Sequence, residues 1–223
     1  MAAPLKAGSG AVRPPFWPHA KRRLSAADPV LGGIIRRHPR ISMTYRGDAF
    51  HTLARSIVGQ QISVKAADSV WARVVGTCGE MSPRAVKLRR VATLRRCGLS
   101  GRKVEYLRDL AAHFADGRVD PASLARMSDD EVVASLTDIR GIGRWTAEMF
   151  LIFNLQRPDV LPLDDLGLLK AVERHYLQGR TVAFLQREEG RRQVVELARR
   201  WVPYRSVATW YLWRSLDPVP VEY

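Results

Sequence analysis

The chain has 223 residues, and 46% of them are hydrophobic, which suits one compact unit, of one or two lobes, with a sizeable core. Lysine and arginine number 36 against 22 aspartate and glutamate residues, and the formal net charge of +14 favours a nucleic acid as partner over an anionic lipid surface. No run approaches the roughly 18 apolar residues of a membrane span and no signal peptide stands out, so we expect no contact with a membrane.

The first half of the chain predicts a tail and three helices. Residues 1 to about 20 are rich in proline, glycine and alanine without periodicity, so we expect a tail that is flexible or lies on the surface. A helix should begin at Asp28–Pro29, where proline suits the first turn, and end at His38–Pro39. Apolar residues at helical spacing predict two more helices, over 50–58 and 64–75.

The second half continues the helical pattern. A helix is expected over 104–114, and the capping-box sequence from Ser128 to Glu131 should open the next one. Further helices should follow a glycine hairpin near Gly141, a pair of aspartates at 164–165 and the segment 204–206. Because no run alternates strictly between apolar and polar residues, and no repeat is present, we expect an all-α fold of many short helices.

The stretch from Ile139 to Trp145 predicts a tight glycine hairpin that opens directly onto a helix. Gly141 and Gly143 lack a Cβ, so the backbone can turn with positive φ and approach a ligand closely. The N–H groups of the turn and of the helix start can then face an anion. In so basic a chain, we expect that anion to be a nucleic-acid phosphate.

Two carboxylates follow the hairpin. Asp164 and Asp165 stand at the start of the next apolar helix. An acid near a phosphate anchor suits chemistry on DNA, because a fixed anion can stabilise positive charge that develops during a reaction. Either aspartate could also be an ordinary helix N-cap, and the residues alone do not choose between them.

The cysteines and histidines argue against a metal centre built from side chains. Cys78 and Cys97 are too few for a four-cysteine zinc or iron–sulfur site, and we favour two free thiols in a reducing cytosol over a disulfide. The five histidines are scattered without the spacing of metal ligands, so we expect no zinc.

Three motifs together resemble a known family. They are FHTLARSIVGQQISV at 50–64, LTDIRGIGRWTA at 136–147 and DVLPLDDL at 159–166. In this order they are similar to the helix-hairpin-helix (HhH-GPD) DNA glycosylase superfamily, and within it to the alkylbase branch, DNA-3-methyladenine glycosylase II (AlkA-like). The resemblance covers residues 24 to 216.

The resemblance implies a two-lobed helical fold with the active-site cleft between the lobes. Residues 21–223 would form a single glycosylase unit behind a tail at 1–20. The implied boundaries are about 49–157 for lobe one, which includes the hairpin at 137–145, and about 21–48 plus 158–216 for lobe two.

The resemblance also implies the catalyst. Asp165 aligns with the catalytic aspartate of the family, which leaves Asp164 as the expected helix cap. Relatives with lyase activity carry a lysine where this chain has Trp145, and an indole cannot form an imine with the sugar. The enzyme should therefore be monofunctional.

The same resemblance implies a substrate pocket lined by Trp145, Met149 and Trp213. Indole faces would stack on a flipped base and attract the positive charge of an alkylated purine. Met149 stands where close relatives often have an aromatic residue. The alternative for both tryptophans is an ordinary place in the core.

Contacts with DNA are implied for two loops. The loop with Gln60 and Gln61 would enter the minor groove and fill the gap left by the flipped nucleotide, whereas the alternative is a solvent-exposed loop. The hairpin would contact the backbone through Gly141, Gly143, Arg144 and Thr146. The backbone carbonyls of Thr137, Ile139 and Gly141 would hold a sodium or potassium ion, unless the hairpin binds none.

The implied function is a monofunctional DNA glycosylase that excises 3-methyladenine and 7-methylguanine from double-stranded DNA by base flipping and so initiates base excision repair of alkylation damage. Two alternatives remain: a bifunctional glycosylase/lyase, opposed by Trp145, and a non-catalytic hairpin module, opposed by Asp165. We expect a monomer in the bacterial cytoplasm, associated with nucleoid DNA, that requires no cofactor and holds no iron–sulfur cluster.

Overall fold

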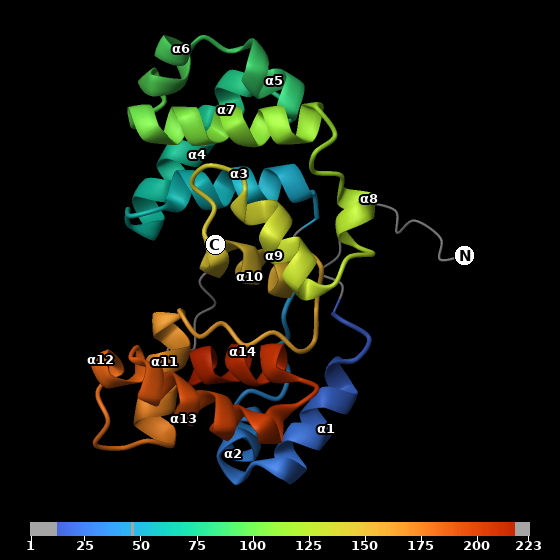
Figure 1. Cartoon of the computed structure of the whole chain (residues 1–223), viewed down its shortest axis with the longest axis vertical. Coiled ribbons are helices and arrows are strands. Elements are labelled where there is room, and N and C mark those ends of the chain that lie inside the picture. Colours follow the sequence, from blue (N-terminus) through green and yellow to red (C-terminus); the bar gives the residue numbers. More distant parts are fainter. Residues whose placement is uncertain (1–12, 46, 217–223) are drawn as a thin grey trace. The chain divides into compact units, whose positions relative to one another are not determined.

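A computed structural model of the chain describes residues 13–45 and 47–216. Over these residues the regular elements are all helices and there is no strand, which confirms the expected all-α fold. The described residues fall into two compact units, one of 13–45 with 156–216 and the other of 47–155 (Figure 1). The cleft between two lobes stays a prediction.

Unit 1 is built around its last helix, α14, which packs against α1, α2 and α11. The apolar centre includes Trp17 of α1, whose ring meets Trp210 of α14 edge-on at 5.2 Å between centroids. The elements of this unit are α1 (Trp17–Ala27), α2 (Pro29–Arg37), α11 (Leu166–His175), α12 (Val182–Leu185), α13 (Glu188–Ala198), the 3₁₀ turn η1 (Arg199–Trp201) and α14 (Arg205–Leu216).

The start of α1 corrects one expectation. Residues 1–12 lie outside the described part of the chain, but Trp17 and Ala20 belong to the first turn of α1 and are fully buried. The prediction of a tail to residue 20 is therefore wrong from Trp17 onward. The physical reason is that the Trp17 indole buries a large apolar area in the core of unit 1, and this burial stabilises a helix that the local composition does not indicate.

A buried carboxylate joins three parts of unit 1. Asp28 caps α2 as predicted, because its Oδ1 accepts the N–H groups of Val30 and Leu31 at 3.0 and 3.1 Å. Its Oδ2 accepts the Tyr176 hydroxyl and the Trp201 indole N–H, each at 2.9 Å. Burial, followed by the nearby charge of Asp28, raises the pKa of Tyr176, so this hydroxyl remains a donor.

Unit 2 is organised around α7, which packs against α3 and α5, while α10 packs against α9 and α3. Its elements are α3 (Ala49–Gly59), α4 (Val64–Cys78), α5 (Pro83–Leu88), α6 (Val91–Arg96), α7 (Gly101–Ala115), α8 (Pro121–Leu124), α9 (Asp129–Thr137) and α10 (Arg144–Phe153). The predicted capping box at the start of α9 forms in both directions between Ser128 and Glu131. Cys78 and Cys97 are buried free thiols.

Every helix that periodicity predicted is present. The matching elements are α2, α3, α4, α7, α9, α10, α11 and α14. The short helices α5, α6, α8 and α12, together with α1 and α13, were not predicted. Across the described ranges, no helix has the length and apolar character that crossing a membrane requires.

Candidate functional site

The glycine hairpin connects α9 to α10 in unit 2 as predicted. Its tight turn is closed by a hydrogen bond from the Ile142 N–H to the Ile139 carbonyl at 3.1 Å. Gly141 has φ +85°, in the left-handed region that favours glycine. A Cβ on Gly141 would stand 2.3 Å from the Tyr106 ring, so the backbone packs directly on that ring.

The hairpin leaves backbone donors at the start of α10. Gly143 is the N-cap residue and provides no side-chain cap, unlike Ser128 at the start of α9. Within the described residues, the N–H groups of Gly141 and Gly143 have no protein acceptor. Together with the positive end of the helix, these groups form a site suited to an anion such as a phosphate.

Two further hairpin residues differ in exposure. Arg144 is exposed and lies 3.6 Å from Glu148, one turn along α10. Thr146 is buried at the third position of the helix, where a backbone N–H has no acceptor within the helix.

Asp165 lies in unit 1, at the start of α11. Its Oδ1 accepts the Leu168 N–H at 2.6 Å, so Asp165 is the N-cap of α11. Oδ1 also accepts the indole N–H of Trp213 at 2.7 Å. The side chain is buried, with a relative exposure of 8%, and both donors stabilise negative charge on its carboxylate.

The expected division of roles between the two aspartates needs a correction. Asp164 was predicted to be the helix cap. Instead, its half-exposed carboxylate forms an ion pair with Arg191 of α13. A capping side chain belongs to the residue directly before the first helical turn and accepts an N–H group of that turn, and only Asp165 has that position. The cap and the proposed catalyst are therefore the same residue.

The sequence did not indicate the part that Gly167 plays. A Cβ at this position would lie 2.9 Å from Trp213 Cδ1 and 3.1 Å from Asp165 Oδ1. The absence of a side chain on Gly167 thus lets the Trp213 ring reach the carboxylate. A lone glycine in the first turn of an expected helix was the one signal present.

The segment before Asp165 is fixed to the start of α14. Arg205 donates from Nε and a terminal nitrogen to the two carboxylate oxygens of Asp159, at 2.8 and 2.9 Å. Ser206 accepts the Val160 N–H at 2.9 Å and donates to the Arg157 carbonyl at 2.7 Å. These contacts fix the start of the helix that carries Trp213 against the segment that leads to Asp165.

Trp145 and Met149 lie one turn apart on α10 in unit 2. Trp145 is half-buried, and Met149 is 9% exposed. Their role as pocket walls stays a prediction.

The two glutamines after α3 point to different uses. Gln60 donates its amide Nε2 to the Gly141 carbonyl at 2.8 Å, which ties the loop to the hairpin. Gln61 is exposed and has φ +58°, a conformation that a residue with a side chain rarely adopts. The neighbouring Ile62, 40% exposed, adds to the loop an apolar side chain that no sequence pattern indicated.

Backbone oxygens near the hairpin fit the chemistry of a hard monovalent cation. Thr137 is the last residue of α9, so its own carbonyl has no partner within the helix. The carbonyls of Ile139 and Gly141 each accept one hydrogen bond, and a carbonyl oxygen has a second lone pair. Over the described ranges, no cluster of three or more His, Cys, Asp or Glu side chains could hold a metal ion.

Comparison with known proteins places the chain in a family. Residues 54–200 match the family described as HhH-GPD superfamily base excision DNA repair protein. DNA-3-methyladenine glycosylase 1 of Schizosaccharomyces pombe is 33% identical over 75% of this chain and 72% of its own length. A DNA-3-methyladenine glycosylase of Saccharomyces cerevisiae is 34% identical over 75% of this chain, which spans 66% of that protein.

Solved structures agree. The chain is similar to a crystal structure of DNA-3-methyladenine glycosidase from Bacillus halodurans, with a TM-score of 0.76, 31% identity and coverage of 93% and 92% of the two chains. It also resembles the S. pombe 3-methyladenine DNA glycosylase in complex with abasic DNA, with a TM-score of 0.72, 29% identity and coverage of 91% and 100%. The chain therefore belongs to the HhH-GPD superfamily of base excision DNA repair proteins, in its DNA-3-methyladenine glycosylase branch.

Proposed function

We propose that this protein is a monofunctional DNA glycosylase that removes 3-methyladenine and 7-methylguanine from double-stranded DNA and so initiates base excision repair. One observation carries the proposal: a buried carboxylate, Asp165, is held at a helix N-terminus by the Leu168 N–H and the Trp213 indole. The relatives named DNA-3-methyladenine glycosylase support the same activity.

The chemistry needs an anion of this kind. Breaking the bond between C1′ and the base nitrogen builds positive charge on the sugar, and the fixed carboxylate of Asp165 stabilises that charge. Water adds to C1′ and loses a proton, while an alkylated purine, positively charged before cleavage, departs neutral. The product is an intact abasic site.

We propose no lyase step, because such a step requires an amine that attacks C1′ of the sugar. Trp145 stands in the position where the lyase-active relatives have a lysine. An indole N–H cannot form an imine, and arginine stays protonated. Lys170 of α11 is exposed, whereas Asp165 is buried.

DNA binding is assigned to unit 2. The N–H groups of Gly141 and Gly143 would bind a backbone phosphate, and Gln61 would fill the gap that a flipped base leaves. A sodium or potassium ion at the carbonyls of Thr137, Ile139 and Gly141 would add positive charge beside that phosphate. The net charge of +14 predicts affinity that falls steeply with salt.

The test is a base-release assay on randomly methylated duplex DNA, with the released purines identified. Asp165→Asn should fold, because its amide oxygen can still accept the Leu168 N–H, but should release bases roughly 100- to 1000-fold more slowly. Asp164→Asn is the matched control, because it removes the neighbouring exposed charge and should keep most of the activity. Near-normal release by Asp165→Asn would refute the assignment.

A second assay separates the monofunctional reading from the lyase alternative. Incubation with a lesion duplex and borohydride should trap no covalent complex, and strand breaks should appear only after alkali treatment. A trapped complex formed at the rate of base release would establish an amine nucleophile instead.

A further inference from the structure

Helix α7 holds the end of α3 and the loop that carries Gln61. The ammonium group of Lys103 donates to the carbonyls of Val58 and Gln60, both at 2.7 Å. Val58 lies in the last turn of α3 and Gln60 is its C-cap, so a positive charge meets the negative end of that helix. The loop therefore starts from a fixed point on α7.

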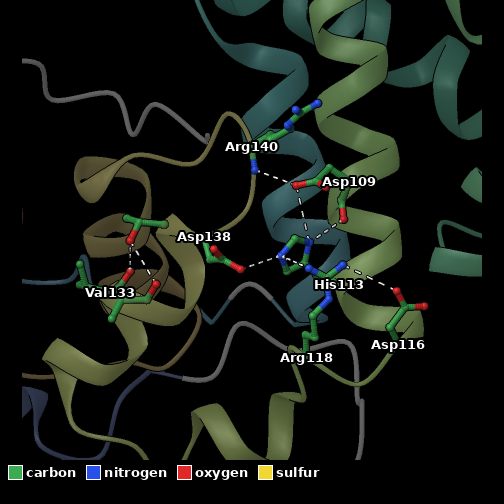
Figure 2. Close-up of polar contacts among 9 residues, drawn as sticks. Asp109, His113, Asp116, Arg118, Val133, Asp138 and Arg140 are labelled. Atoms are coloured by element: carbon green, nitrogen blue, oxygen red, sulfur yellow. Dashed lines mark hydrogen bonds and ion pairs between the residues drawn. The ribbon is translucent and has the colours of Figure 1, made fainter.

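The same helix also holds the hairpin. The carboxylate of Asp109 accepts the backbone N–H of Arg140 at 2.8 Å (Figure 2). Between Lys103 and Asp109 on α7, Tyr106 places its ring against Gly141. Gln60 then joins loop and hairpin directly through its bond to the Gly141 carbonyl. Loop, hairpin and α7 thus form a closed ring of contacts within unit 2.

Asp109 is itself held in place by a buried imidazole. Arg118 lies 2.8 Å from His113 Nε2. Because a backbone carbonyl only accepts, His113 Nδ1 carries a proton and donates to the Asp109 carbonyl at 2.9 Å. Figure 2 shows this imidazole between Asp109 and Asp138, whose carboxylate lies 3.2 Å from Nε2. The acceptor for the Arg140 N–H is therefore built into the fold.

We propose that Lys103, Tyr106 and Asp109 are positioning residues, which fix the spacing between the Gln61 loop and the hairpin so that both match one stretch of distorted duplex. Gln60 belongs to this arrangement as the link between loop and hairpin, in place of the DNA contact that the resemblance implied. Fixing two contact segments before binding removes an ordering cost from association. The inference rests on the proposed function, since that function makes both segments DNA contacts.

The charge of Asp109 makes the expected change in DNA affinity opposite in sign to a purely electrostatic effect. A carboxylate beside a phosphate-binding turn repels DNA, so its removal should tighten binding if only charge matters. If Asp109 positions the hairpin, its removal should weaken binding although the protein becomes more positive. Glu105, exposed on the same helix, is the matched control for the charge alone.

The experiment measures affinity for a duplex with a stable abasic-site analogue, together with hydrogen exchange of the Arg140 amide. Asp109→Ala should weaken binding by about 10- to 100-fold, the scale of one hydrogen bond to a charged acceptor, and speed exchange at Arg140. Asp109→Asn keeps an acceptor oxygen and should restore both. Glu105→Ala should bind as tightly as the wild type or more tightly.

Two results would overturn the proposal. One is binding by Asp109→Ala equal to that of Glu105→Ala with unchanged exchange at Arg140. The other is equal weakening by Asp109→Ala and Asp109→Asn. Base release by the wild type is measured in parallel, because its absence would contradict the proposed function while binding and exchange still report on positioning.

The contacts of Lys103 with the Gln61 loop are tested with a fluorescent base, 2-aminopurine, placed opposite the abasic analogue to report insertion of the loop. Lys103→Met should reduce the fluorescence change at saturating protein. Arg102→Met removes an equal charge from the neighbouring exposed position and should lower affinity without reducing the change at saturation. Equal behaviour of the two variants would show that Lys103 contributes charge alone.

Discussion

Gly167→Ala tests whether the contact between Trp213 and Asp165 controls the chemistry. The new methyl group would stand 2.9 Å from Trp213 Cδ1 and 3.0 Å from Nε1, distances that force the ring to move. Because Nε1 donates to Asp165 at 2.7 Å, this movement must lengthen or break the bond that orients the carboxylate. The perturbation reaches the proposed catalyst without changing it.

The expected effect on catalysis is larger than the effect on folding. A hydrogen bond to a charged acceptor contributes about 1.5–3 kcal/mol, so base release should slow by about 10- to 100-fold. Replacing glycine in a helix by alanine gains up to about 1 kcal/mol, which offsets part of the roughly 1–3 kcal/mol cost of overpacking. The free energy of unfolding should therefore fall by at most about 2 kcal/mol.

The assay is single-turnover release of 3-methyladenine, with unfolding followed separately in urea. Gly33→Ala in α2 is the control, because a Cβ there would meet only the ends of the Arg37 and Arg36 side chains, at 3.6 and 3.9 Å. It should be fully active. Release by Gly167→Ala at the wild-type rate would refute the idea that Trp213 orients Asp165.

Three further predictions concern the hairpin and stability. Gly141→Ala, with φ +85° and a Cβ 2.3 Å from the Tyr106 ring, should destabilise unit 2 by about 1–3 kcal/mol and weaken DNA binding; unchanged denaturation would contradict the close packing. Asp28→Ala leaves buried donors unpaired and should lower unfolding free energy by about 3 kcal/mol or more, whereas a loss typical of surface substitutions would argue against the network. Burial lowers the pKa of His51 and His175 from 6.5, so the unfolded chain binds protons more readily than the folded chain. The stability that this difference contributes is complete above pH 6.5 and is lost as the pH falls through the lowered pKa values. His175→Gln should therefore reduce the slope of Tm against pH, and an unchanged slope would contradict this.

Local signals were enough to predict most of the long helices. The proline after Asp28 and the capping box from Ser128 to Glu131 mark helix starts through contacts within a few residues, and both appear in the structure. The periodicity of 50–58 reflects burial of one helix face. Helix α1 was missed because burial of Trp17 depends on helices far along the chain.

The candidate site was only partly accessible from sequence. The glycine hairpin and the acidic pair were evident, since each is a local pattern. The roles of Asp164 and Asp165 were not, because they depend on which carboxylate meets the N–H groups at the helix start and on where Arg191 and Trp213 lie.

The sequence by itself determined the helical class, the positive charge, the hairpin and the family. Tertiary structure alone decided that Trp213 donates to Asp165 and that Gln60 binds the hairpin. These hydrogen bonds join residues 48 and 81 positions apart. A periodic pattern or a helix cap involves residues within one or two helical turns, so it can be recognised in the sequence. A hydrogen bond between distant residues depends on packing that brings both groups together, and so has no local signature.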